Sequence, residues 1–305
     1  MNEFLTFDSK QTKQSFWSIR IRKLSLLAFL IFWLILYFLL APSPLTLASQ
    51  RWTLILTGFA GAMIGNLSAV GGGLVFIPVM IFICKLPPII ALKIALASQC
   101  VGMTSGAISW LGKTPVCRKA LVFAVPALLI GSTVSCLLIR PNPFLIKALF
   151  GPVSIILGVP VLVTARKQTG ATKSSIDSRW LMPVFAISLL GGLISGCVAV
   201  GEGEVVAAFL MLAAGVDSAT SIATGVTLLA VTSIYLTIIH QFFLGGIPWD
   251  YAWFTALGCA IGAALAPIVA RRFDERKLKY AFAAIAILDG CLFIYQSVNI
   301  GGHLP

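Results

Sequence analysis

Charged side chains are scarce in this sequence: they make up 10% of the residues, with 10 acidic residues and 2 histidines in 305. Soluble domains carry about 25% charged residues. Hydrophobic residues here reach 59%, and the mean hydropathy is +1.00. A water-soluble globule cannot bury so large a share of apolar surface, because much of a sphere of this size must face water. The scarcity of charge therefore excludes an ordinary soluble domain and indicates a membrane protein.

Motifs of catalysis and of metal binding are also missing. The chain has no P-loop Gly-Lys-Ser/Thr, so this chain alone is not expected to drive transport with ATP. It has neither an H-E-x-x-H nor a G-x-S-x-G motif. The seven cysteines form no C-x-x-C and have no metal-ligand spacing with a histidine. We therefore expect no enzyme activity, no catalytic residues, no metal and no cofactor.

Nine apolar runs follow one another, and most have the length of one transmembrane helix. They cover residues 24–41, 52–84, 89–111, 119–139, 144–165, 181–214, 218–243, 250–270 and 278–297. The runs 52–84 and 181–214 are too long for a single span, and both are interrupted by glycines. A backbone break at membrane depth is tolerated only inside protein or beside a water-filled cavity. Each long run is therefore predicted to be a re-entrant pair of half-helices that meet at a glycine-rich bend.

The positive charges predict the topology. Of the 22 Lys and Arg residues, 17 lie in four segments: 1–23, 111–119, 166–180 and 271–279. These segments share one side only if each long run returns to the face from which it enters. The positive-inside rule makes that side cytoplasmic. We therefore expect a multi-pass protein of the plasma (cell inner) membrane with a cytoplasmic N-terminus and an external C-terminus, and the net charge of +12 does not indicate a nucleic-acid partner.

Two halves of the chain resemble each other. Ala-Val-Gly-Gly-Gly at 69–73 and Ala-Val-Gly-Glu-Gly at 199–203 agree at four of five positions. Each half has a broken run followed by three spans, and the two halves start from opposite sides, which is typical of inverted-repeat transporters. The predicted fold is an all-α polytopic membrane protein. Its predicted parts are a cytoplasmic tail (1–23), an extra transmembrane helix (24–41), a first repeat (52–165), a cytoplasmic linker (166–180), a second repeat (181–297) and an external tail (298–305).

The glycine-rich bends carry a resemblance to a known family. Gly-Asn-Leu-Ser-Ala-Val-Gly-Gly-Gly-Leu-Val-Phe-Ile-Pro at 65–78 and Gly-Leu-Ile-Ser-Gly-Cys-Val-Ala-Val-Gly-Glu-Gly at 192–203 resemble the doubled signature of the TauE/SafE sulfite exporter family of membrane permeases, of the 4-toluene sulfonate uptake permease type. The likeness extends over about 52–297. It implies proton-driven transport of sulfite, sulfonates or related organic anions. This sequence departs from the signature at Glu202 and Glu204.

The bends supply the candidate substrate site. A bend leaves backbone N–H groups unpaired at the start of a half-helix, where the partial positive charge can hold an anion. Glycines permit the close approach and the positive φ angles that such a bend needs, although close helix packing through small residues is the alternative. Polar side chains near the bends either contact the substrate or serve helix contacts. The substrate-binding candidates are Asn66, Gly71, Gly72, Gly73, Gly201, Gly203, Thr224 and Thr227.

Three of the charged residues inside the apolar runs are candidates for a functional role. Glu202 and Glu204 are candidates for proton coupling, because an intramembrane carboxylate is costly and is functional by default. Their alternative role is to cap the half-helix that starts there. Lys93 is a candidate counter-charge for a glutamate or for the substrate; alternatively its stem reaches the outer interface.

The sequence thus predicts a secondary transporter of a small sulfur-containing or organic anion that works by alternating access. The expected partners are the anion, protons and the lipid bilayer, and a homodimer stays open. An anion channel or uniporter is the main alternative. A membrane-embedded enzyme that uses Glu202 and Glu204 is less favoured, because the neighbouring valines supply no further polar groups.

Overall fold

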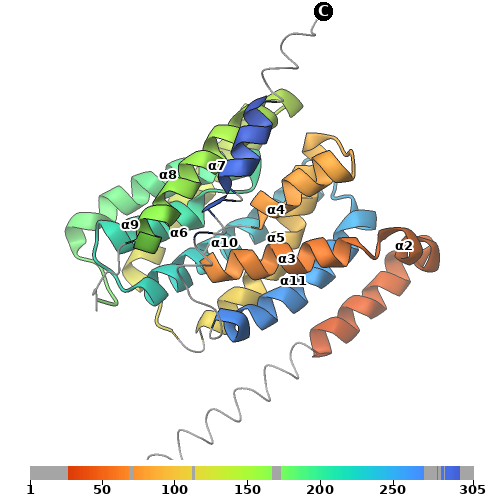
Figure 1. Cartoon of the computed structure of the whole chain (residues 1–305), viewed down its shortest axis with the longest axis horizontal. Helices are drawn as coiled ribbons and strands as arrows, with labels where there is room; N and C mark the ends of the chain where they lie inside the picture. Colours follow the sequence, from red (N-terminus) through yellow and green to blue (C-terminus); the bar gives the residue numbers. More distant parts are fainter. Residues whose placement is uncertain are drawn as a thin grey trace, which may run out of the picture. The chain divides into compact units, whose positions relative to one another are not determined.

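The structure is a computed structural model of the chain, shown in Figure 1. It divides into two units, residues 1–50 and 51–305. The residues that it describes are 27–68, 72–111, 114–166, 173–270, 280, 283–284 and 286–295.

The first unit contains the predicted extra helix. Its described part, Leu27–Leu40, is followed by α2 (Pro44–Arg51), and the two helices are bent by 117° at the break between them. The first of these helices has 14 residues and is about 21 Å long, shorter than the roughly 30 Å of a bilayer's apolar core. The predicted span at 24–41 stays a prediction, and its described part is followed by a second, short helix after the bend.

The second unit is helical, and its one β-type contact in the described part is a bridge between Lys173 and Val216. The final helix of this unit is described continuously over Ala286–Tyr295. The other helices, in chain order, are α3 (Leu54–Ser68), α4 (Gly73–Pro78), the π-helix η1 (Val79–Ile83), α5 (Pro88–Leu111), α6 (Arg118–Thr133), the π-helix η2 (Val134–Ile139), α7 (Pro143–Arg166), the 3₁₀-helix η3 (Ser178–Trp180), α8 (Leu181–Val198), α9 (Glu202–Leu212), α10 (Ser218–Phe242) and α11 (Trp249–Ala270).

Both long apolar runs contain the predicted break. The first run contains α3 and the continuous pair α4–η1, with residues 69–71 between them outside the described residues, and the second divides into α8 and α9. The second break has a clear backbone cause, because Ala199 has φ 54° and Gly201 has φ 128°, and neither value continues a right-handed helix. The two arms of this run differ in length: Ser178–Val198 is long enough to cross a membrane alone, whereas α9 has 11 residues. The division into two helices is confirmed, and a re-entrant path stays a prediction.

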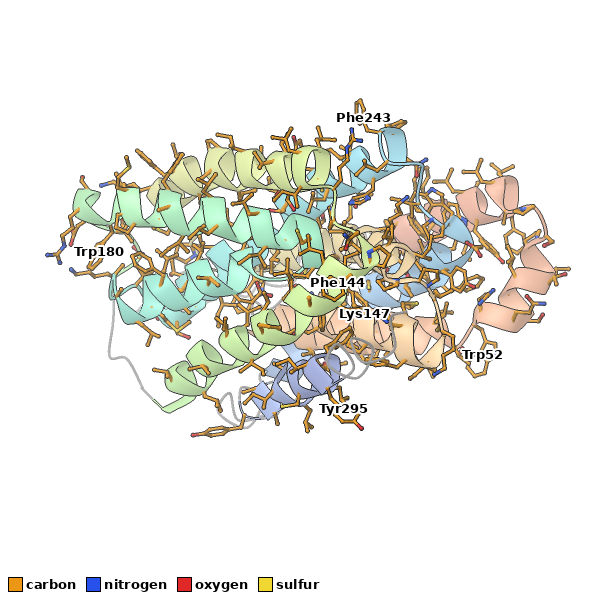
Figure 2. All side chains as sticks on the ribbon, turned by 90° about the horizontal axis from the view of Figure 1, so that it is seen from above. Trp52, Phe144, Lys147, Trp180, Phe243 and Tyr295 are labelled. Atoms are coloured by element: carbon orange, nitrogen blue, oxygen red, sulfur yellow. The ribbon has the colours of Figure 1, made fainter. Side chains whose placement is uncertain are left out.

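The surface of the second unit is apolar, and polar groups lie inside. Large hydrophobic side chains point outward all along the helices; Figure 2 shows Phe144 and Phe243 among them. Other exposed examples are Ile83, Ile108, Val122, Ile156, Met182, Leu190 and Phe242. Buried polar side chains include Asn66, Lys93, Ser98, Gln99, Ser132, Glu202, Glu204, Thr232, His240 and Thr255. This distribution is the reverse of that in a soluble domain and suits a lipid environment.

The described helices are long enough for several membrane crossings. Four of them have the length and apolar composition of a span, or five if the bent N-terminal pair counts as one. The four are Pro88–Trp110, Arg118–Ile139, Ser178–Val198 and Ser218–Phe242. The chain is therefore an all-helical, multi-pass membrane protein.

Helices from the two halves pack against each other through glycines. α3 lies along α11, and α8 lies along α6 (Figure 1). A Cβ atom added at Gly58 or Gly258 would lie 2.0 Å from a backbone oxygen across the α3–α11 contact. At Gly131 or Gly192 the corresponding distance across the α6–α8 contact is 2.2 Å. No side chain fits at such distances, so these glycines set the close approach of the helices.

Local structure repeats at the offset that the sequence predicts. α5 begins at Pro88 and α10 at Ser218, and this separation equals that between the two glycine-rich motifs. The Leu86 N–H donates to the Met80 carbonyl at 2.9 Å after η1, and the Val216 N–H donates to the Leu210 carbonyl at 2.8 Å after α9. The two hydrogen bonds are equivalent, because their donors and their acceptors are separated by this same offset. The helix ends of the two halves are thus built alike.

Candidate functional site

The two helix breaks lie against each other. Gly73 is the first residue of α4, and a Cβ atom added there would lie 2.5 Å from the Ala199 carbonyl oxygen and 2.7 Å from Cγ2 of Val200. Ala199 and Val200 form the turn between α8 and α9. Glycine is therefore required at position 73 by the approach of the other half. Gly72 is the N-cap residue of α4, and Gly71 lies outside the described residues.

Gln99 of α5 contacts both breaks. Its Nε2 donates a hydrogen bond to the Ala199 carbonyl at 2.7 Å, and it would lie 2.9 Å from a Cβ atom added at Gly73. The side chain is buried. Gln99 is not among the site residues predicted from the sequence, although a lone amide in an apolar helix was the signal for it. Its donor fixes the turn of the second half against the first half.

Glu204 serves the backbone of the second break. Its Oε2 accepts a hydrogen bond from the Gly201 N–H at 3.1 Å, which is the capping role at the start of α9. Gly201 itself has a φ angle that L side chains rarely adopt. Gly203 faces α10, since a Cβ atom there would lie 2.7 Å from the Gly225 carbonyl oxygen. These residues hold the shape of the break.

Glu202 is placed differently from Glu204. It is 1% exposed, its carboxyl group lies beside the hydroxyls of Ser195 and Thr232, and its backbone packs against Gly191. Its Oε2 has no hydrogen-bond partner among the described residues. A buried ionised carboxylate without full pairing is costly, whereas the protonated acid gains an O–H donor. Glu202 is thus a buried carboxyl group with one oxygen left unpaired among the described residues.

Asn66 closes the end of α3 against α5. Its Nδ2 donates to the Ala62 carbonyl at 2.8 Å and, more weakly, to the Gly102 carbonyl at 3.4 Å. Its buried Oδ1 has no partner in the described part of the chain and lies where a Cβ on Gly106 would be. The amide therefore satisfies backbone carbonyls, and its oxygen is left as a free acceptor.

The hydroxyls of the two threonines bond to backbone groups. Thr224 Oγ1 donates to the Thr220 carbonyl at 2.6 Å and accepts from the Cys117 N–H, just before α6, at 2.9 Å. Thr227 Oγ1 donates to the Ala223 carbonyl at 2.7 Å. Both hydroxyls are thus engaged with backbone groups, as in the helix-packing alternative.

Lys93 is not brought to either glutamate. Its Nζ donates to the Leu244 carbonyl at 2.6 Å, in the loop between α10 and α11. The ion pairs found among the described residues join Asp177 to Lys173 and to Arg179, so none of them involves Lys93. The lysine therefore lies near the N-terminal end of α5, beside the loop between α10 and α11.

The described residues contain no group of three His, Cys, Asp or Glu side chains arranged to hold a metal ion. The cysteines are free thiols.

The contact between Gln99 and the second break predicts a measurable effect. In a Gln99→Leu variant the Ala199 carbonyl loses its buried donor, and we expect the transport rate to fall about tenfold, because an orphaned buried acceptor costs about 1–3 kcal/mol. Thr104→Val on the same helix is the matched control, since the Thr104 hydroxyl is buried without a partner in the described part. Flux into proteoliposomes measures both. Equal rates in the two variants would contradict a role for Gln99 at the breaks.

Helices of spanning length around two meeting breaks, with a carboxyl group buried at one of them, are features of a multi-pass membrane transporter. The sequence model of the family described as "Sulfite exporter TauE/SafE" matches residues 54–292, and the chain belongs to this family. It is similar to the "Probable membrane transporter protein YunE" of Bacillus subtilis (strain 168), with 22% identity over 80% of this chain and 97% of that protein. No solved structure matches the chain with significance. The family places the chain among membrane transporters rather than enzymes.

Proposed function

We propose that the protein is a proton-coupled secondary transporter of a small sulfur-containing or organic anion, such as sulfite or a sulfonate, and that it works by alternating access. The observation that carries the proposal is the meeting of the two helix breaks at Gly73 and Ala199, with the carboxyl group of Glu202 buried three residues further on. The family description, which names sulfite, supports the substrate class.

The electrostatics of the breaks favour an anion. The helical segment Gly73–Ile83 and α9 both begin where the breaks meet. Helix N-termini carry partial positive charge and unpaired N–H groups, so two of them at one place attract an oxyanion. Gln99 adds a side-chain amide that can donate to the same place. No fixed cation is needed for such a site.

Coupling to protons follows from the position of Glu202. An ionised carboxylate beside the breaks repels an anionic substrate, and a protonated one does not. Protonation of Glu202 and binding of the anion therefore favour each other, and by linkage the effect is reciprocal. Glu204, held by the Gly201 N–H, keeps the second break in shape while Glu202 changes its charge.

The packing of the halves supports inverted repeats. The first helix of each half packs on the fourth helix of the other half, α3 on α11 and α8 on α6. The same glycine-mediated contact made in both directions is what a two-fold relation between the halves produces. In transporters of this kind one bundle rocks against the other around a site at the repeat interface. With the positive charges inside, the N-terminus is cytoplasmic and the C-terminus external.

The test is flux in proteoliposomes that contain the purified protein, an imposed pH gradient and a pH-sensitive dye. Sulfite, methanesulfonate, sulfate and acetate are supplied in turn. We expect proton movement that depends on sulfite or the sulfonate and is absent from protein-free liposomes. Anion flux without proton movement would instead identify a channel or uniporter. Absence of flux for all four anions would overturn the substrate class.

A further inference from the structure

A buried cation lies at the end of α5, away from the breaks. Lys93 is 8% exposed, and among the described residues its Nζ donates one hydrogen bond, to the Leu244 carbonyl. No carboxylate of the described residues lies within ion-pair distance of its Nζ. Gly245 covers it, because a Cβ atom added there would lie 3.8 Å from Nζ. An ammonium group has three donors, so two of them are left over for a ligand.

A second donor from another helix lies beside this lysine. His240 of α10 is 4% exposed and is close enough to Lys93 for their charges to interact. Its Nε2 contacts the Cys136 thiol at 3.8 Å, and its Nδ1 has no partner in the described part of the chain. The Lys93 ammonium has no acidic side chain within ion-pair distance in the described part, so its charge is uncompensated, and the His240 ring adds a nitrogen that can hydrogen-bond to a ligand. Burial of such a charge is costly unless an anion completes it.

The position of this pair relative to the breaks is informative. Lys93 precedes Gln99 by six residues on α5, which corresponds to about 9 Å along the helix axis. α5 packs along α10, the helix that carries His240. Lys93 therefore lies near the N-terminal end of α5, and His240 lies near the C-terminal end of α10. Along α5, the lysine is about two helical turns from Gln99, which contacts both breaks.

We propose that Lys93 and His240 form a second anion site, covered by the loop between α10 and α11, which a small oxyanion occupies on its way to or from the breaks. The inference rests on the proposed function and adds a second binding site to the route of the transported anion. The ligand chemistry is that of sulfite or a sulfonate: a compact oxyanion that accepts hydrogen bonds from an ammonium and an imidazole. A lipid phosphate shares this chemistry, so the experiment separates the two sources.

The test is equilibrium binding of radiolabelled sulfite to the purified full-length protein in a neutral detergent. Lys93→Met keeps the apolar stem and removes the charge, and we expect it to weaken binding about tenfold or more, because charge-assisted hydrogen bonds are the strong ones. Lys93→Arg keeps the charge and its charge-assisted hydrogen bonds, and should stay within about threefold of the wild type. His240→Gln is the independent variant. Its sulfite affinity decides the test if Lys93→Met lowers the melting temperature.

The outcomes separate the two proposals. If the wild type binds and transports sulfite, and Lys93→Met and His240→Gln bind it with the same affinity, the second site is overturned and the proposed function stays intact. A wild-type protein that neither binds nor transports sulfite or methanesulfonate would overturn both. A third outcome is that phosphatidylglycerol displaces sulfite, that binding of this lipid depends on Lys93, and that Lys93→Met transports at the wild-type rate. This outcome would identify a lipid headgroup site and overturn the second site for the transported anion.

Discussion

Replacement of Glu202 by glutamine is expected to separate anion flux from proton movement. Glutamine has nearly the size of the protonated acid and cannot ionise, so the pocket between Ser195 and Thr232 stays filled. Accumulation of sulfite driven by a pH gradient should fall to the level of protein-free liposomes, while downhill exchange of the anion continues. The measurement is dye-reported proton movement beside radiolabelled sulfite flux in the same liposomes.

Glu204→Gln is the matched control for this variant. Glu204 caps α9 through the Gly201 N–H, and a weakened cap costs about 1 kcal/mol of stability. We expect a lower melting temperature with proton coupling retained, the opposite of the Glu202→Gln result. Normal pH-driven transport by Glu202→Gln would remove Glu202 from the mechanism.

Gly73→Ala is expected to stop transport almost completely. The added methyl group would lie 2.5 Å from the Ala199 carbonyl oxygen, a backbone atom of the other half. One of the two breaks must then shift. A displacement of about 1 Å at a functional site can cost about a hundredfold in rate, so we expect a loss of that order. Flux of sulfite down its own gradient is the measurement, because it does not depend on proton coupling.

Gly158→Ala in α7 controls for a methyl group added to a helical glycine. Its Cβ would meet a side-chain atom of Ile287 at 3.3 Å, which a small adjustment accommodates. This variant should transport within about threefold of the wild type, since overpacking against a side chain costs little when that side chain can move. Wild-type flux in Gly73→Ala would show that the contact between the breaks is not part of the transport path.

Much of the architecture is readable from composition. Apolar runs mark the helices because lipid-exposed backbone must form its hydrogen bonds within the segment. The glycines at 71–73 and at 201 and 203 mark the breaks because they interrupt runs too long for one helix. The constant offset between these two motifs then predicts the repeated helix ends after η1 and after α9. All of these features are local in sequence.

The parts of the site that depend on tertiary contacts could not be predicted from the sequence. The two glutamates are equivalent candidates in the sequence, and only the turn at Gly201 directs Glu204 to the backbone and leaves Glu202 in the interior. Gln99 meets Ala199 across 100 residues of chain, so no spacing rule could pair them. The π-helices η1 and η2 also carry no periodic signal.

The glycine contacts of α3 with α11 also bear on how the protein is made. α3 is synthesised well before its partner, and at ordinary ribosome speeds of about 5–20 residues per second the interval is on the order of 10–40 s. During that time the face of α3 around Gly58 contacts lipid or another membrane helix instead of α11. The first half therefore has no finished form of its own. The two halves complete their packing together, when the last third of the chain inserts into the membrane. A substitution at a glycine of α3 or of α11 is therefore limited by the helix that packs against it.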